Sequence, residues 1–257
     1  MDTTAYLARI GVSTPLPPDP QTLSKLHLAH LTAVPFENLD IHLGRKIVLD
    51  EESFFTKVVH QRRGGFCYEL NGLFAALLRH LGFRVTLLSA RVTRVEGGFG
   101  PEYDHLTLLV EFPGSQPRRL ADVGFGDSFR EPLLFDESGV QPAAPHDNAS
   151  AYRLDRAGDG VTLLRREEDG VWKPQYAFSE TPRRLDEFAA MCHFQQTSPD
   201  SHFTQRRICS RATDNGRITL ADLRLIVTEN GLRTETMLEE SEYRAALLRE
   251  FGIDLEA

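Results

Sequence analysis

Residues 62–71 read Arg62-Arg63-Gly64-Gly65-Phe66-Cys67-Tyr68-Glu69-Leu70-Asn71, and here a Gly-Gly loop leads into an amphipathic helix. After Cys67 the apolar residues recur at steps of three and four, at Leu70, Leu73, Phe74, Leu77, Leu78 and Leu81, which predicts a helix that ends at Gly82. Cys67 therefore lies in or just before the first helical turn. Unpaired backbone N–H groups and the helix dipole favour an anion there, so we expect a lowered thiol pKa and a nucleophilic sulfur.

A cysteine beside an apolar helix is more often a small buried hydrophobic residue than a nucleophile, so Cys67 alone does not establish a catalytic site. Two later stretches favour catalysis. One predicted strand opens at Asp104-His105, and a second, spanning residues 119–126, carries Asp122 inside an apolar run. A cysteine, a histidine and an aspartate supply a nucleophile, its base and a group that orients the base.

The loop between these two strands decides whether His105 and Asp122 share a face of the sheet. If residues 113–116 form a four-residue loop, His105 lies opposite Gly124. Asp122 is then one diagonal step from His105, and both side chains point to the same face. A three-residue loop would place them on opposite faces, because side chains alternate along a strand. The proposed triad therefore predicts the four-residue register.

Five features follow one another along the chain: Val34-Pro35-Phe36-Glu37-Asn38-Leu39, Arg63-Gly64-Gly65-Phe66-Cys67, His105 at the head of a strand, Asp122-Val123-Gly124-Phe125-Gly126, and Ser198-Pro199-Asp200-Ser201-His202-Phe203. In these motifs and their order the chain resembles the arylamine N-acetyltransferase family, over roughly residues 5–250. The resemblance implies a cysteine-protease-like core of Cys67, His105 and Asp122. It also implies that Phe36, Phe125 and Phe203 line the substrate pocket.

The activity that this resemblance implies is acetyl transfer from acetyl-CoA to an arylamine, arylhydroxylamine or arylhydrazine, as in xenobiotic metabolism. The reaction would be ping-pong, through an acetyl-cysteine intermediate at Cys67. The backbone N–H of Cys67 is our candidate oxyanion donor. Acetyl-CoA is the cosubstrate and no metal is expected, but the sequence assigns no residue to coenzyme A. One departure is Asp104, where many relatives carry a small or hydroxyl residue beside the histidine.

Composition is ordinary for a soluble globular protein, with 41% hydrophobic and 26% charged residues among 257. The net charge of −8 and the absence of a basic stripe argue against nucleic acid as a partner. Three cysteines without paired spacing fit a reducing cytosol. The N-terminus lacks a basic and apolar leader pattern, and no apolar run approaches about 18 residues, so we expect a cytoplasmic protein without a membrane partner.

We expect an α+β fold. Residues 1–82 would form a helical bundle that carries Cys67, with Asp19 and Asp50 as helix N-caps. β-Branched residues and short turn-punctuated strands predict an antiparallel β-barrel over residues 83–180, carrying His105 and Asp122. A linking helix opened by Pro182 would occupy residues 181–200. Residues 201–257 would form an α/β lid, with Asn215-Gly216 as a hairpin signal and a last helix ending at Gly252.

Three other functions compete with this interpretation. A transglutaminase-like or papain-like thiol hydrolase would use the same triad with a different acyl acceptor. An amide synthase of the same fold would act on a carrier-bound acyl chain. A zinc-binding or non-catalytic interaction module is the weakest alternative, because structural zinc usually draws on closely spaced ligand pairs. The physiological acceptor, the acyl-chain range and the oligomeric state do not follow from the sequence.

Overall fold

The computed structural model describes residues 1–13, 16–114, 116–137, 139–143, 151–167 and 169–255. The N-terminal part is helical, and Asp2, Asp19 and Asp50 each accept a hydrogen bond from the backbone N–H three residues later, which confirms the two predicted caps. The elements are α1 (Thr3–Arg9), α2 (Pro20–Ala33), β1 (Phe36–Glu37), α3 (Leu39–His42), α4 (Glu51–Phe55), the π-helical turn η1 (Thr56–His60) and α5 (Cys67–His80).

Helix α5 runs through the centre of the molecule. Every side chain from Cys67 to Leu78 is buried, so this helix is covered on all sides. Its apolar residues join one cluster with the neighbouring helices and with Leu87 and Leu108 of the adjoining sheet. Gly82 follows the helix with a φ of +92°, a left-handed conformation that glycine adopts without steric cost. Cys67 is the first residue of the helix, as predicted.

An eight-stranded antiparallel sheet follows, in the order β5-β4-β3-β2-β9-β8-β7-β6. Its strands are β2 (Arg84–Val92), β3 (His105–Glu111), β4 (Arg119–Ala121), β5 (Leu133–Leu134), β6 (Gln141–Pro142), β7 (Ala151–Ala157), β8 (Gly160–Arg166) and β9 (Trp172–Ser179). The edge strands β5 and β6 are joined by a side chain: Leu134 N donates to Gln141 Oε1 at 2.6 Å, and Gln141 Nε2 donates to Leu134 O at 2.9 Å. The predicted barrel is therefore nearly closed.

Strands β3 and β4 pair in the predicted register. Leu108 faces Ala121 and Val110 faces Arg119, and the same count sets His105 opposite Gly124. Strand β3 is buried on both faces: Leu108 packs with the helices, whereas Leu109 belongs to the cluster inside the barrel. Because side chains alternate along a strand, His105 lies on the same side as Leu109. The histidine therefore begins a strand fixed by core packing on both sides.

The segment after the barrel reaches a second sheet. Its elements are the 3₁₀ turn η2 (Leu185–Phe188), α6 (Ala189–Thr197), α7 (His202–Gln205), β10 (Ile208–Thr213), β11 (Gly216–Ala221), β12 (Arg224–Glu229) and β13 (Leu232–Met237). The prediction that Pro182 opens the helix is wrong by three residues. Arg183 N instead donates to Leu87 O at 2.9 Å, so the backbone there is still paired with β2.

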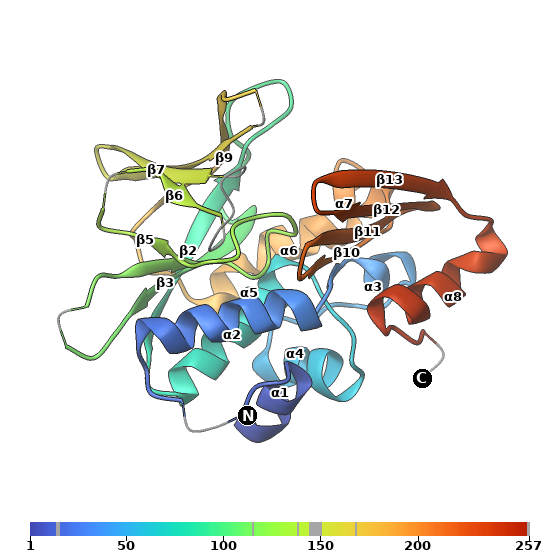
Figure 1. Ribbon diagram of the computed structural model, residues 1–257, viewed down its shortest axis with the longest axis horizontal. Helices are drawn as coiled ribbons and strands as arrows, with labels where there is room; N and C mark the ends of the chain where they lie inside the picture. The colour runs from blue at the N-terminus through green and yellow to red at the C-terminus, as the bar shows by residue number, and fades with distance from the viewer. Residues whose placement is uncertain (14–15, 115, 138, 144–150, 168, 256–257) are drawn as a thin grey trace.

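The chain ends in the 3₁₀ turn η3 (Glu240–Glu242), α8 (Tyr243–Ala246) and the π-helical turn η4 (Leu247–Phe251), which Gly252 ends at a φ of +67°. Figure 1 shows the barrel sheet and the β10–β13 sheet on opposite sides of the molecule, with α1, α2 and α4 below them. Strand β1 pairs with β10 and so ties the helical region to this second sheet. No helix among the described residues is long and apolar enough to span a bilayer. The exact domain boundaries stay a prediction.

Candidate active site

His105 and Asp122 meet at the end of the β3–β4 hairpin. His105 is the first residue of β3, and Asp122 directly follows β4. The two side chains are buried, and His105 Nε2 lies 2.7 Å from Asp122 Oδ2. The register therefore joins two groups that the sequence keeps seventeen residues apart.

Four donors surround the Asp122 carboxylate. Oδ2 accepts from His105 and from the Tyr176 hydroxyl at 2.9 Å. Oδ1 accepts from Asn71 Nδ2 at 2.8 Å and from the Gly124 backbone N–H at 3.0 Å. Burial by itself raises the pKa of this carboxyl, but the His105 charge and these hydrogen bonds outweigh burial and hold the pKa below its ordinary value. Asp122 is therefore ionised at neutral pH.

Cys67 is 3% exposed, and its sulfur faces the backbone N–H of Leu106, the residue after His105. Burial raises the pKa of the thiol well above its ordinary value, and the Leu106 N–H opposes this effect. Our expectation of a lowered thiol pKa is wrong, because desolvation of the buried thiolate outweighs the stabilising Leu106 N–H. The thiol therefore needs a neighbouring proton acceptor to become a nucleophile.

Gly124 and Asn71 hold the hairpin against the start of α5. A Cβ at Gly124 would lie 2.8 Å from Cys67 Cα, so only glycine allows this approach. Asn71 Nδ2 donates to Leu106 O at 2.6 Å, and Asn71 Oδ1 accepts from the backbone N–H of Val123 at 2.9 Å. The sequence reasoning did not assign Asn71 a role. Its signal is a polar residue one helical turn after the cysteine, at the start of the apolar run of the helix.

Tyr176, on β9, is a second residue that the sequence reasoning missed. Its ring centroid lies 5.1 Å from that of His105, and its hydroxyl binds Asp122. Burial raises the pKa of this hydroxyl well above its ordinary value, so Tyr176 stays protonated and donates to the carboxylate. Nothing local in the sequence indicates the role, because Tyr176 follows Asp122 by 54 residues.

The three predicted pocket phenylalanines lie in two places. Phe125 packs edge-on against His105, with ring centroids 5.1 Å apart, and also contacts Tyr176. Phe36 and Phe203 lie together, with centroids 6.1 Å apart, and Phe203 also meets the ring of Phe66, the residue before Cys67. Phe125 therefore lies beside His105, whereas Phe203 lies beside Phe66, the residue that precedes Cys67 in the chain.

Glu37 and Asn38 fix loops through side-chain hydrogen bonds. Glu37 accepts from Arg63, the first residue of the Arg-Gly-Gly-Phe-Cys motif, at 2.8 Å, and both side chains are buried. Asn38 Nδ2 donates to the backbone oxygens of Phe203 at 2.9 Å and of Arg206 at 2.7 Å, while its Oδ1 accepts from Ile208 N. These bonds anchor the loop before Cys67 and the segment that carries Phe203.

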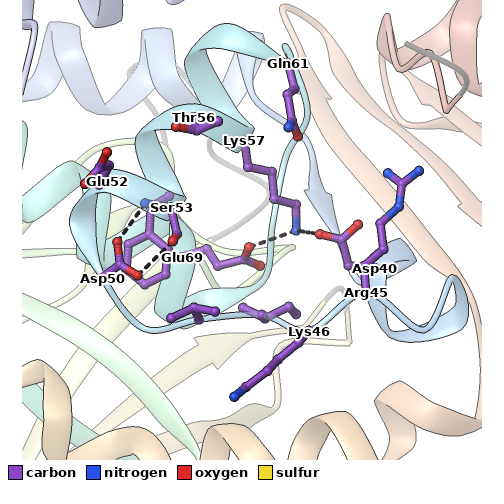
Figure 2. Close-up of a pocket in the computed structure, with 13 residues that line it drawn as sticks. Asp40, Arg45, Lys46, Asp50, Glu52, Ser53, Thr56, Lys57, Gln61 and Glu69 are labelled. Atoms are coloured by element: carbon purple, nitrogen blue, oxygen red, sulfur yellow. Dashed lines mark hydrogen bonds and ion pairs between the residues drawn. The ribbon is translucent and has the colours of Figure 1, made fainter.

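Five buried charged residues lie next to the start of α5: Glu37, Asp40, Lys57, Arg63 and Glu69. Figure 2 shows Lys57 reaching between Asp40 and Glu69, and its Nζ lies 2.8 Å from an oxygen of each. The same region borders a cavity of about 800 Å³. Glu69 Oε2 also accepts from the backbone N–H of Phe66 at 3.0 Å, which caps the helix that begins at Cys67.

Charge balance in this group leaves one carboxylate in excess. Glu37, Asp40 and Glu69 share the two cations Lys57 and Arg63. Glu69 is fully buried, and burial raises its pKa to about 7, with Lys57 opposing the shift and Glu37 adding to it. Glu69 is therefore the member of the group that takes up a proton near neutral pH.

Asp104, the departure noted in the sequence, is bound to α6. Its Oδ1 accepts from Gln195 Nε2 at 2.7 Å, and Gln195 in turn binds Ser201. Burial raises the pKa of Asp104, and its negative charge adds to the raised pKa of Cys67. Within the described residues, no group of three or more histidine, cysteine or acidic side chains is arranged to hold a metal ion.

Comparison with known proteins gives one consistent family. Residues 19–257 match a family profile described as N-acetyltransferase. The chain is 37% identical to an arylamine N-acetyltransferase of Mycolicibacterium smegmatis, over 99% of this chain and 93% of the relative. It is also 33% identical to the proansamycin X synthase of Amycolatopsis mediterranei, over 96% of each chain.

Comparison with solved structures supports the same family. The structure of the Mycobacterium marinum arylamine N-acetyltransferase in complex with CoA superimposes with a TM-score of 0.89, at 34% identity, over 98% of this chain and 93% of that one. The α+β architecture expected from the sequence is thereby confirmed. The chain therefore belongs to the arylamine N-acetyltransferase family, and the protein is an acyltransferase.

Proposed function

We propose that this protein transfers an acetyl group from acetyl-CoA to an arylamine, arylhydroxylamine or arylhydrazine by way of acetyl-Cys67. The observation that carries the proposal is the buried His105–Asp122 pair, 2.7 Å apart, together with a buried cysteine that begins a helix and faces Leu106, the residue after His105. A relative named as an arylamine N-acetyltransferase and a related structure in complex with CoA support the substrate classes. Cys67, His105 and Asp122 are the proposed catalytic residues.

The first half-reaction forms the acyl-enzyme. Asp122 binds Nε2 of His105, which leaves Nδ1 to take the proton from the Cys67 sulfur. The thiolate attacks the acetyl carbonyl carbon, a new C–S bond forms, and the bond to the coenzyme A sulfur breaks. The imidazolium returns its proton to the departing coenzyme A thiolate. We assign the backbone N–H of Cys67 as a donor to the oxyanion of the intermediate.

The second half-reaction moves the acetyl group to the acceptor. The neutral amine nitrogen attacks the thioester carbonyl, and the bond to the Cys67 sulfur breaks. His105 passes the proton released by the amine to the sulfur and so restores the thiol. Phe36, Phe125 and Phe203 are the proposed acceptor-binding residues, because their apolar rings exclude water that would hydrolyse the thioester.

Intact mass measurement tests the first half directly. After mixing with acetyl-CoA alone, the protein gains one acetyl group, and the Cys67→Ala variant gains none. Unmodified wild-type protein, or acetylation that survives Cys67→Ala, would reject the proposal. Release of free coenzyme A that depends on an added arylamine separates this activity from that of a thiol hydrolase, for which water suffices.

The proansamycin X synthase among the relatives favours one second candidate, an amide synthase acting on a carrier-bound acyl chain. The triad would form an acyl-cysteine in the same way, but from a different thioester. Protein that is acylated by a long-chain pantetheine thioester and not by acetyl-CoA would establish this alternative.

We also propose a cytoplasmic location. Cys67, Cys192 and Cys209 are all free and buried, which suits a reducing compartment. A reducing compartment also protects a thiol nucleophile from oxidation.

A further inference from the structure

We propose that His27, on α2 and outside the triad, is a positioning residue that closes the loop of residues 122–130 and thereby holds Asp122 in place for catalysis. The inference rests on the acetyl transfer proposed above and adds a residue to it. His27 is completely buried in the helical region, and its ring joins that region to both ends of a loop of the barrel, whereas Asn71 of α5 binds only the start of the loop.

The two ring nitrogens of His27 reach the two ends of this loop. Nδ1 lies 2.9 Å from the backbone oxygen of Arg130, and Nε2 lies 3.1 Å from the backbone nitrogen of Asp122. Phe129 stacks on the imidazole, with centroids 5.7 Å apart and ring planes 5° from parallel. Phe74 of α5 meets the same ring edge-on. The two aromatic rings therefore fix the imidazole, and its two hydrogen bonds join the first and last residues of the loop, Asp122 and Arg130.

The partners determine which nitrogen of His27 carries the hydrogen. A carbonyl oxygen only accepts, so Nδ1 must donate to Arg130, and the Nε2 lone pair then accepts from the Asp122 N–H. Nε2 is also 3.1 Å from the Asp122 oxygen, but a hydrogen on Nε2 would leave the Asp122 N–H without this acceptor. Burial lowers the pKa of His27 to about 4, so the ring is neutral and suited to this pairing.

The loop that His27 closes carries much of the site. On its inner side Gly124 lies against Cys67, and Phe125 packs on His105. On its outer side Asp127 binds Arg217 of β11 at 3.1 Å, and Arg130 donates to the Thr213 oxygen of β10 at 2.7 Å. A loosened loop would move the carboxylate that orients His105, and misplacement by about 1 Å is enough to cost a large factor in rate.

His30 provides a matched control. It lies one turn further along α2, is equally buried, and also packs edge-on against Phe74. Its Nδ1 binds the Tyr6 hydroxyl at 2.8 Å, within the helical region and away from the 122–130 loop. Replacement of either histidine disturbs the same part of the core, but only His27 bonds the loop.

The experiment compares His27→Phe, His27→Leu, His27→Gln and His30→Phe by single-turnover acetylation of Cys67 with acetyl-CoA, normalised to folded protein. His27→Phe keeps an aromatic ring but removes both hydrogen bonds, so we expect the rate to fall about 10- to 100-fold. His27→Gln offers one donor and one acceptor and should recover the rate to within about threefold of wild type. His30→Phe should lose thermal stability to a similar degree, with its rate within about twofold of wild type.

Hydrogen–deuterium exchange supplies a readout that needs no catalysis. Amides of residues 122–130 should exchange faster in His27→Phe than in His30→Phe. Equal rates of acetylation for His27→Phe and His30→Phe, or unchanged exchange in the loop, would overturn the inference. His27→Leu gives the same comparison if His27→Phe does not fold. Wild-type protein that is never acetylated would reject the proposed function instead, and the exchange comparison would still decide whether His27 holds the loop.

Discussion

His105 Nε2 and Asp122 Oδ2 lie 2.7 Å apart because the β3–β4 hairpin pairs in a register that sets the two side chains one diagonal step apart on the same face. The contact is buried, and Tyr176, Asn71 and the Gly124 N–H complete the shell around the carboxylate. The hairpin register therefore brings the imidazole to the carboxylate, and side chains from β9 and α5 hold the carboxylate in place.

Replacement of Asp122 by asparagine should slow acetylation of Cys67 by about 10²- to 10⁴-fold, because an amide cannot stabilise the imidazolium and no longer selects the His105 tautomer. The measurement is single-turnover acetylation by acetyl-CoA followed by intact mass. Circular dichroism of the variant checks that the fold is kept. A folded variant with a rate near that of wild type would remove Asp122 from the mechanism.

Replacement of Asp104 by asparagine should lower the pKa of Cys67. The negative charge of Asp104 adds to the raised pKa of that thiol, so its removal makes the thiolate less unfavourable. The pH dependence of iodoacetamide alkylation at Cys67 should then shift to lower pH. Asp159→Asn, at an exposed turn, is the control and should leave the profile unchanged. A shift to higher pH would contradict the assignment.

Replacement of Lys57 by methionine should destabilise the protein by about 3–5 kcal/mol, because it leaves Asp40 and Glu69 buried without their shared cation. Urea unfolding measures the change. Arg184→Met removes an exposed cation that pairs with Asp186 and should change the free energy of unfolding far less, because solvent screens that pair. Equal costs for the two variants would mean that the buried group contributes no more than a surface ion pair.

The pH dependence of stability should report Glu69. Its folded-state pKa of about 7 exceeds the ordinary 4.5, so between these values the folded protein holds a proton that the unfolded chain releases. The contribution to stability is fully present below pH 4.5 and is lost as the pH rises through about 7. In wild type this proton makes the unfolding free energy fall with rising pH, by up to about 1.4 kcal/mol per pH unit. Glu69→Gln should remove this contribution to the slope.

A series of urea titrations between about pH 5 and 8 makes this comparison. Glu52→Gln replaces an exposed carboxyl on the rim of the same cavity and serves as the control (Figure 2). Its pH profile should follow that of wild type. Parallel profiles for Glu69→Gln and wild type would show that Glu69 is ionised throughout this range.

Local patterns predicted much of the fold. The caps at Asp19 and Asp50, the helix that begins at Cys67 and the register that pairs His105 with Asp122 each depend on residues close together in the chain. The helix expected at Pro182 failed because a strand bond from Arg183 to Leu87 competes with it. That competitor lies almost a hundred residues away, beyond the reach of a propensity argument.

The sequence by itself determined where the sulfur, the imidazole and the carboxylate sit on their secondary-structure elements, because periodicity, capping and hairpin counting are short-range properties of the chain. Only the tertiary structure decided their electrostatics and their support. Burial, not the helix start, sets the direction of the Cys67 pKa. Asn71, Tyr176 and His27 reach Asp122 from separate elements. Desolvation and long-range hydrogen bonds exist only once the chain has packed, so no local pattern encodes them.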